Sequence, residues 1–336
     1  MIPARGAPLA GAPGELGELG KTSWVDATMA DVLRDLQHAV PQELLPLTLE
    51  EASRYSVQEF GCGAYGCVMP TRTKNLVLKL TGDPTEAIFA GVAMKLAERE
   101  GWPDGIVRYH RALELPLEGP IEPEGEDYEY QRLFLLWRDE VKDPGFLSSK
   151  RRLSSAESAA RDGMLQYMLV IDQFYEVLPR SQAGQRALLT HAGAPRLSAE
   201  VDAFVLPRLE RGEQPHEIAA QAASIADDAR QQPLAAAVIL ACARMSLVAT
   251  LDSPVGAPAA GAALYYFDQG LLLSDLHTGN LARAVDAPHH AVISDPGVVV
   301  ALDKRYFGAE FPREWRLHPA PTARRRAELS TQPIPL

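Results

Sequence analysis

The spacing of the apolar residues changes near residue 141, and this change limits the fold more than any other feature of the sequence. Before that point, short apolar runs alternate with glycine-rich or polar turns, which is typical of β-strands. After it, apolar residues recur at the three- and four-residue spacing of helices. A chain with strands in its first part and helices in its second is expected to be α+β.

The first part predicts a small sheet of five strands with one helix. The helix is expected over residues 85–99, because Asp83 can cap its N-terminus and Pro84 suits the first helical position. It separates the third predicted strand from the fourth. The strands are expected at residues 55–60, 67–71, 76–80, 106–113 and 130–137.

The second part predicts long helices followed by short strands. Residues 253–262, rich in alanine, glycine and proline, are expected to form a loop. Two short apolar runs, residues 271–273 and 291–293, are expected to pair as a small hairpin. The helices are expected at residues 156–178, 199–211, 216–230 and 233–251.

These patterns also suggest a domain organisation. Residues 1–20 contain much glycine, proline and alanine and are expected to form a flexible tail. Residues 21–54 predict a helical extension, and residues 318–336 predict a loose C-terminal tail. Between them, a strand-rich domain is expected over residues 55–141 and a helical domain over residues 142–317.

Composition argues against several classes of function. The formal net charge is −11, so no general attraction to nucleic acid or anionic lipid is expected. Three cysteines, Cys62, Cys67 and Cys242, are too few for a disulfide framework and match no zinc spacing. The most apolar stretch, residues 234–251, contains Arg244 and is interpreted as a buried helix. With no signal-peptide pattern at the start, the protein is expected in the cytoplasm.

A glycine-rich segment lies between two predicted strands. The G-x-G-x-x-G of a dinucleotide-binding fold opens a helix, whereas a strand–loop–strand version lets backbone amides cover nucleotide phosphates. The position therefore favours a phosphate-covering loop, with an ordinary glycine-rich hairpin as the alternative. The segment consists of Gly61, Cys62, Gly63, Ala64, Tyr65, Gly66, Cys67 and Val68.

One strand later, Lys79 ends an apolar run. A lysine there can hold nucleotide phosphates and needs an acidic partner on the following helix. Glu86, in the first turn and on an apolar face, is the favoured partner, while Glu98 and Glu100 are rivals. A solvated lysine at a strand end is the simpler alternative.

The second part holds the most specific signal. Asp275 is followed by Leu276 and, five residues after the aspartate, by Asn280, which is the D-L-x-x-x-N spacing of a catalytic loop. Such a loop puts a carboxylate beside an attacking hydroxyl and an amide oxygen on magnesium. Asp295 ends a later strand, two residues before Gly297, and its carboxylate suits a magnesium ion.

The chain resembles the protein-kinase-like superfamily over roughly residues 55–305. It carries the family's motifs in the family's order: a glycine loop, a strand lysine, a helix glutamate, a catalytic loop and D-x-G. The D-L-H-x-G-N wording looks like the small-molecule kinases and other atypical kinases, and Asp295-Pro296-Gly297 looks like protein kinases. The resemblance implies a two-lobed fold with a five-stranded N-lobe, a mainly helical and truncated C-lobe, and ATP with Mg²⁺ as cofactors.

The resemblance also implies a role for each motif. Asp275 would orient or deprotonate the acceptor, supported by Lys79 on the phosphates and Asn280 on the metal. Mg²⁺ would be held by Asn280 and Asp295, and adenine would meet the hinge after residue 137. ATP would be bound by Gly61, Cys62, Gly63, Ala64, Tyr65, Gly66, Val68, Lys79, Glu86, Asp139, Glu140 and Val141.

The chain departs from the family pattern at several positions. Leu273 and Ser274 stand where His-Arg usually precedes the catalytic aspartate, and His277 stands where a lysine is usual in serine/threonine kinases. Pro296 replaces the usual phenylalanine, and only 39 residues follow Gly297. The missing arginine removes the usual anchor for a phosphorylated activation loop.

The expected function is an Mg-ATP-dependent kinase that phosphorylates protein Ser/Thr hydroxyls, with Asp275 as the catalytic carboxylate. A small-molecule hydroxyl is the alternative acceptor. A nucleotide-binding pseudokinase and an AMP transferase on the same fold are the competing functions, because fold alone does not specify chemistry.

Overall fold

The computed structural model describes a defined part of the chain, and every structural statement below refers to that part. It comprises residues 42, 45, 61–63, 66–115, 133–148, 152–179 and 181–303. The predicted strand at residues 55–60 and both predicted tails lie outside it, as do nearly all of residues 21–54. So do Ala64 and Tyr65 of the glycine segment.

The chain divides into two compact units. Unit 1 consists of Met1–Trp102, Val107–Lys142 and Ala284–Asp286. Unit 2 consists of Pro103–Ile106, Asp143–Arg283 and Ala287–Leu336. Both contribute to an α+β protein with small antiparallel sheets, as the sequence predicts.

Unit 1 contains a five-stranded antiparallel sheet in the order β1-β2-β3-β5-β4. Most of the predicted strands are present with shifted ends. The exception is the start of the fourth, where Ile106 instead forms an isolated bridge with Ile293 in unit 2. The strands are β1 (Gly61–Gly63), β2 (Gly66–Pro70), β3 (Leu76–Thr81), β4 (Tyr109–Leu115) and β5 (Leu133–Asp139), followed by the short β6 (Val141–Lys142).

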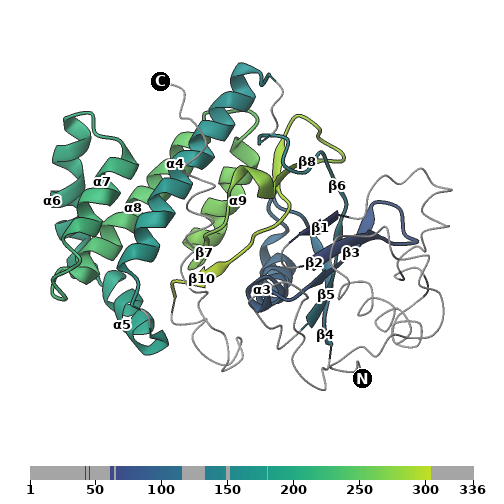
Figure 1. Cartoon of the computed structure of the whole chain (residues 1–336), viewed down its shortest axis with the longest axis horizontal. Helices are drawn as coiled ribbons and strands as arrows, with labels where there is room; N and C mark the ends of the chain where they lie inside the picture. The colour runs from purple at the N-terminus through teal and green to yellow at the C-terminus, as the bar shows by residue number, and fades with distance from the viewer. Residues whose placement is uncertain are drawn as a thin grey trace. The chain divides into compact units, whose positions relative to one another are not determined.

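Helix α3 (Pro84–Glu100) lies where the sequence predicts it. A carboxylate oxygen of Asp83 accepts a hydrogen bond from the Thr85 backbone N–H at 2.8 Å, so the predicted cap is formed. The helix ends at Gly101, where the backbone adopts a φ of 83°. Its apolar face packs on β4 and β5 (Figure 1), with the Phe89 ring edge-on to Tyr109 at 6.3 Å.

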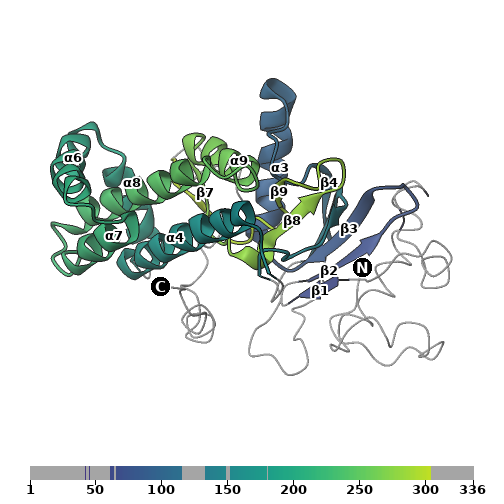
Figure 2. The same cartoon turned by 90° about the horizontal axis from the view of Figure 1, so that it is seen from above.

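Unit 2 is built around helix α8 (Gln232–Thr250), which contacts all the other α-helices of this unit that the structure describes. Helix α5 has no counterpart among the sequence predictions. These other helices are α4 (Ser155–Val177), α5 (Gln182–Ala192), α6 (Pro195–Glu210), α7 (Pro215–Ser224) and α9 (Ala257–Asp268). Figure 2 shows α8 among α4, α6, α7 and α9.

Helix α8 is long and apolar enough to cross a membrane, with a mean hydropathy of 1.8. Length and composition alone do not separate such a span from the core helix of a globular protein. Here Val238, Ile239 and Leu247 are fully buried, together with alanines that let neighbouring helices approach closely. The helix therefore forms the core of unit 2.

The loop predicted over residues 253–262 is wrong from residue 257 onward, because α9 begins there. Alanine has the highest helix propensity, and a proline is tolerated in the first turn, where Pro258 lies. Several alanines of α9 are buried. Tertiary burial thus favours a helix in a segment whose composition also suits a loop.

The predicted hairpin between residues 271–273 and 291–293 is also wrong. Strand β7 (Leu271–Leu273) pairs with β10 (Val299–Ala301). Strand β9 (Ala291–Ile293) pairs instead with β8 (Leu281–Ala284). Short apolar runs of equal length carry no information about which partner each one takes, so packing selects the pairs.

Candidate functional site

The glycine-rich segment forms an antiparallel hairpin in unit 1. Gly61 pairs with Val68, and Gly63 pairs with Gly66 across β1 and β2. Strand β2 then continues the sheet by pairing with β3 rather than leading into a helix. The segment therefore lacks the parallel strand–turn–helix geometry of a dinucleotide-binding fold. Its strand–loop–strand geometry suits both a phosphate-covering loop and the alternative, an ordinary glycine-rich hairpin.

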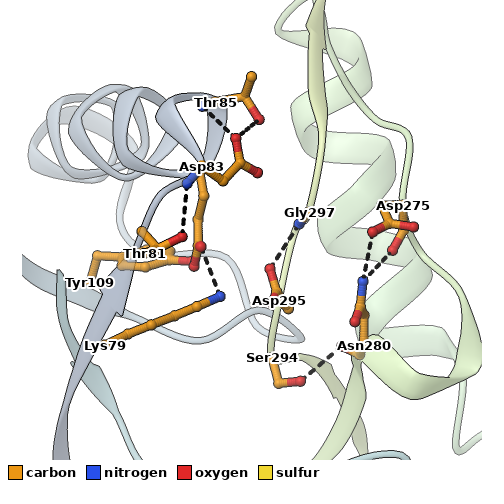
Figure 3. A network of polar contacts seen from close by, with 11 residues as sticks. Lys79, Thr81, Asp83, Thr85, Tyr109, Asp275, Asn280, Ser294, Asp295 and Gly297 are labelled. Carbon is orange, nitrogen blue, oxygen red and sulfur yellow. Dashed lines mark hydrogen bonds and ion pairs between the residues drawn. The ribbon is translucent and has the colours of Figure 1, made fainter. Parts of the chain in front are cut away.

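A buried ion pair lies on the same sheet. The Lys79 ammonium lies 2.7 Å from a carboxylate oxygen of Glu86. Lys79 is 5% exposed and Glu86 is 1% exposed, and the Tyr109 hydroxyl donates a further hydrogen bond to Glu86 at 3.1 Å (Figure 3). The rival glutamates, Glu98 and Glu100, lie at the exposed end of α3. Burial strengthens the attraction within the pair and limits its motion.

In unit 2, hydrogen bonds from the Asn280 side chain to Asp275 join the two ends of the Asp275–Asn280 loop. The Asn280 amide nitrogen donates to the Asp275 backbone carbonyl at 2.7 Å and to its carboxylate Oδ2 at 3.2 Å (Figure 3). Because the nitrogen is held toward Asp275, the amide oxygen of Asn280 is directed away from it. The loop between them ends in a 3₁₀ turn, Thr278–Asn280.

Asp295 is tied to the same loop through the backbone. The Asn280 carbonyl accepts hydrogen bonds from the Ser294 N–H at 2.9 Å and from the Asp295 N–H at 3.4 Å. The ladder between β8 and β9 explains this proximity, because Leu281 pairs with Ile293 and the chain runs on from there. The Asp295 carboxylate also accepts from the Gly297 N–H at 3.0 Å. The backbones of Asn280 and Asp295 are thus hydrogen-bonded to each other in unit 2.

Gly297 lies directly against Asp275. Its backbone has a φ of 58°, and a Cβ placed there would lie 2.3 Å from the Cβ of Asp275 and 2.6 Å from its Oδ2. Real Cβ atoms do not approach so closely, and positive φ disfavours any residue with a side chain. Sequence reasoning identified the glycine as part of D-x-G but did not identify this contact.

Two tyrosines of α4 hold the strand before Asp275. The Tyr167 hydroxyl donates to the Leu273 carbonyl at 2.7 Å, and burial raises the pKa of Tyr167 well above its usual value, so it remains a donor. The Tyr175 hydroxyl lies 2.5 Å from the Ser274 hydroxyl, which donates in turn to the Val298 carbonyl at 2.7 Å. Nothing in the sequence links these tyrosines to a loop about 100 residues away.

His277 orders the Asp275–Asn280 loop. Its Nδ1 accepts a hydrogen bond from the Gly279 N–H at 2.9 Å, so in the neutral imidazole the proton is on Nε2. That Nε2 lies 3.9 Å from Oδ1 of Asp275. A Cβ at Gly279 would lie 2.6 Å from Cε1 of His277, so the glycine makes room for the ring. These contacts give His277 a role in ordering the loop.

The backbone of the predicted hinge is already partly engaged within unit 1. The Asp139 N–H donates to the Arg108 carbonyl at 2.9 Å, and the Glu140 N–H donates to the Asn75 carbonyl at 2.8 Å. Val141 follows as the first residue of β6. The backbone N–H groups of Asp139 and Glu140 therefore donate to other residues of unit 1 and are not available to a nucleotide base.

The two clusters suit different chemical tasks. In unit 1, a lysine held by a buried acid beside a glycine hairpin can bind an anionic group. In unit 2, carboxylate and amide oxygens are of the kind that binds a hard cation, and a second carboxylate can orient a hydroxyl. Cys242 offers no nucleophile at neutral pH, because burial raises its pKa to about 12.

Comparison of the chain with models of known protein families, with curated proteins and with solved structures gives no match.

Proposed function

We propose that this protein is an Mg-ATP-dependent phosphotransferase with a two-lobed protein-kinase-like fold, and that it phosphorylates serine or threonine hydroxyls of a protein. The observation that carries the proposal is the arrangement in unit 2. Asp295 comes from a different loop than Asp275 and Asn280, yet hydrogen bonds through the side chain and backbone of Asn280 join all three. Phosphoryl transfer needs such a combination of an orienting carboxylate and metal-binding oxygens.

In this proposal, Lys79 binds the phosphates of the nucleotide. Glu86 holds the ammonium by a 2.7 Å ion pair, and Tyr109 supports Glu86 from β4. A lysine fixed in this way loses little side-chain entropy on binding phosphate. The hairpin of β1 and β2, paired beside β3, contributes backbone amides over the phosphates.

Asn280 and Asp295 would hold the magnesium ion. The donor set fits, because Mg²⁺ prefers oxygen and takes only one or two protein ligands in nucleotide enzymes, with phosphates and waters completing the shell. The Asn280 nitrogen is occupied by Asp275, which leaves the oxygen as the atom presented to a cation. When bound, the ion supplies neutralisation of charge on the phosphate oxygens.

Asp275 would orient the acceptor hydroxyl and take its proton. Asp275 is 7% exposed, in a loop fixed by Asn280 on one side and Gly297 on the other. Positioning of this kind contributes more to phosphoryl transfer than covalent chemistry by the protein. A cytoplasmic protein acceptor, and no nucleic acid or membrane, completes the proposal.

The test measures whether the γ-phosphate or the AMP part of ATP is transferred to an acceptor. Purified protein is incubated with Mg²⁺ and with γ-labelled or α-labelled ATP, in the presence of protein and small-molecule acceptors. Transfer of the γ label alone is expected. Asp275→Asn should lower that transfer by about 10²- to 10⁴-fold and leave Mg-ATP affinity nearly unchanged, because it removes a positioned acid–base group.

The matched control is Asp252→Asn, the same substitution at an exposed aspartate of unit 2, which should retain full transfer. Full activity in Asp275→Asn would contradict the catalytic assignment. Transfer of the α label would identify an AMP transferase instead. Binding of Mg-ATP without transfer of either label would identify a pseudokinase.

A further inference from the structure

The two carboxylate oxygens of Asp275 have different neighbours. Oδ2 accepts a hydrogen bond from the Asn280 amide nitrogen at 3.2 Å, and a Cβ placed at Gly297 would lie 2.6 Å from it. Oδ1 instead lies 3.9 Å from Nε2 of His277. Oδ2 is therefore the oxygen that holds the loop together. Under the proposed function, Oδ1 is the oxygen that meets the acceptor.

His277 presents a hydrogen-bond donor beside Oδ1. Its Nδ1 accepts from the Gly279 N–H at 2.9 Å. A nitrogen that accepts a hydrogen bond carries no proton, so in the neutral imidazole the proton is on Nε2. The ring cannot turn freely, because the Gly279 backbone lies close to Cε1 and Nδ1. The nitrogen nearest to Oδ1 is thus a donor and not a base.

The space between these two atoms suits one hydroxyl oxygen. A separation of 3.9 Å is too long for a direct hydrogen bond, but one oxygen atom can lie about 2.8 Å from both Nε2 and Oδ1. The His277 side chain is 31% exposed and that of Asp275 is 11% exposed, so a group from solution can reach them.

The chemistry of the pair favours a hydroxyl over a phosphate oxygen. A hydroxyl has one proton, which Oδ1 can accept, and two lone pairs, of which one can accept from Nε2–H. The second lone pair is then left to attack. An ionised phosphate oxygen has no proton for Oδ1 and is repelled by its negative charge.

We propose that His277 is a second catalytic residue, which binds the oxygen of the acceptor hydroxyl through its Nε2–H. The inference rests on the proposed function and adds the group that orients the attacking oxygen. In the transfer, the hydroxyl proton passes to Oδ1 of Asp275 and the oxygen forms a bond to the γ-phosphorus. The bond from that phosphorus to ADP breaks, and its electron pair leaves with ADP. His277 keeps its proton throughout.

Two substitutions separate the roles of the two nitrogens. Asparagine carries an oxygen near the position of Nδ1, which can accept from the backbone N–H two residues on, but it has no donor at the position of Nε2. Glutamine reaches further and places an amide near the position of Nε2. His277→Asn therefore preserves the contact that orders the loop, and His277→Gln preserves a donor for the acceptor.

The test uses full-length protein with Mg-ATP and measures transfer of the γ-phosphate to dephosphorylated casein and to water. We expect His277→Asn to unfold at the temperature of the wild type and to lower kcat/KM by about tenfold or more, because one hydrogen bond to the reacting oxygen is lost. His277→Gln should unfold at a lower temperature and yet retain more transfer than His277→Asn. The matched control, His289→Asn at an exposed histidine of unit 2, should retain both properties.

Calorimetry with Mg-ATP and Mg-ADP identifies the oxygen that His277 binds. His277→Asn should leave both affinities unchanged. A loss of affinity for ATP alone would place Nε2 on the γ-phosphate and overturn the inference.

Three other outcomes also contradict the proposal. Unchanged transfer in His277→Asn would remove His277 from the reaction, and less transfer in His277→Gln than in His277→Asn would reduce it to a residue that orders the loop. Both results leave the proposed phosphotransferase intact, because the wild type still transfers phosphate. Failure of the wild type to transfer the γ-phosphate to casein or to water would instead refute the proposed function, and the inference with it.

Discussion

Gly297 shows how the lack of one side chain can fix the position of another. Asp275 packs so closely on the Gly297 backbone that even a methyl group would overlap its Cβ and Oδ2. The same glycine donates its N–H to Asp295. One residue therefore spaces the two carboxylates to which the proposed function gives different roles, and its replacement should disturb both.

Gly297→Ala is expected to lower phosphoryl transfer by about 10²-fold or more, because small misplacements of a catalytic group have effects of that size. Gly212→Ala is the control. Gly212 also has a positive φ, 84°, but nothing lies within 4 Å of a Cβ added there. Gly212→Ala should lose about 1–2 kcal/mol of folding free energy from backbone strain, and Gly297→Ala should lose more because its methyl group also overlaps Asp275, as measured by denaturant unfolding. Equal transfer rates in the two variants would contradict the role given to Gly297.

At the scale of elements, helix α4 anchors the strand that leads into the Asp275–Asn280 loop from far along the chain. The hydroxyls of Tyr167 and Tyr175 form hydrogen bonds with the segment that leads into Asp275. The Ser274 hydroxyl in turn donates to the Val298 carbonyl. These bonds hold Leu273 and Ser274, which stand where protein kinases usually carry His-Arg. We therefore expect the loop to be held by neutral hydrogen bonds within the fold, with no requirement for a phosphorylated segment.

Tyr175→Phe removes one hydroxyl from this connection and should lower kcat by about tenfold, the equivalent of roughly 1–1.5 kcal/mol for one buried hydrogen bond. The affinity for Mg-nucleotide should not change. Ser274→Ala should have a similar effect, and the double variant should be no worse than either single one, because the two residues act through one connection. Strictly additive losses in kcat would show that they act independently.

At the scale of the whole molecule, the proposed function assigns binding of the nucleotide phosphates to unit 1. It assigns binding of the metal ion and of the acceptor to unit 2. The buried pair of Lys79 and Glu86 has a structural effect as well as a binding one. Removal of one partner from a buried ion pair usually destabilises a protein by about 3–5 kcal/mol. A loss of activity in a single variant therefore does not by itself identify a phosphate ligand.

The double variant Lys79→Met/Glu86→Gln separates these effects. Lys79→Met alone should lower the unfolding temperature, because Glu86 loses its ammonium partner. The double variant should recover much of that stability, since no unpaired charge remains and Tyr109 can still donate to the amide. Nucleotide affinity should stay low in both. Recovery of nucleotide binding along with stability would show that Lys79 has only a structural role.

Local signals in the sequence determined the class of fold, one helix in detail and the candidate residues. Asp83, Pro84 and Gly101 act within one helical turn of where they stand, so α3 could be placed from the sequence alone. The spacing from Asp275 to Asn280 is also local, because one loop holds both. Alternation and helical periodicity likewise act over a few residues, which is why the α+β class could be predicted.

Only the tertiary structure decided which distant segments meet. It selected Glu86 from three candidate glutamates, paired β7 with β10 and made a helix of residues 257–268. It also brought Tyr175 to Ser274 and Gly297 against Asp275. These outcomes depend on how side chains of many elements fill one core. Packing of that kind acts between residues far apart in the chain, where neither spacing nor propensity carries a signal.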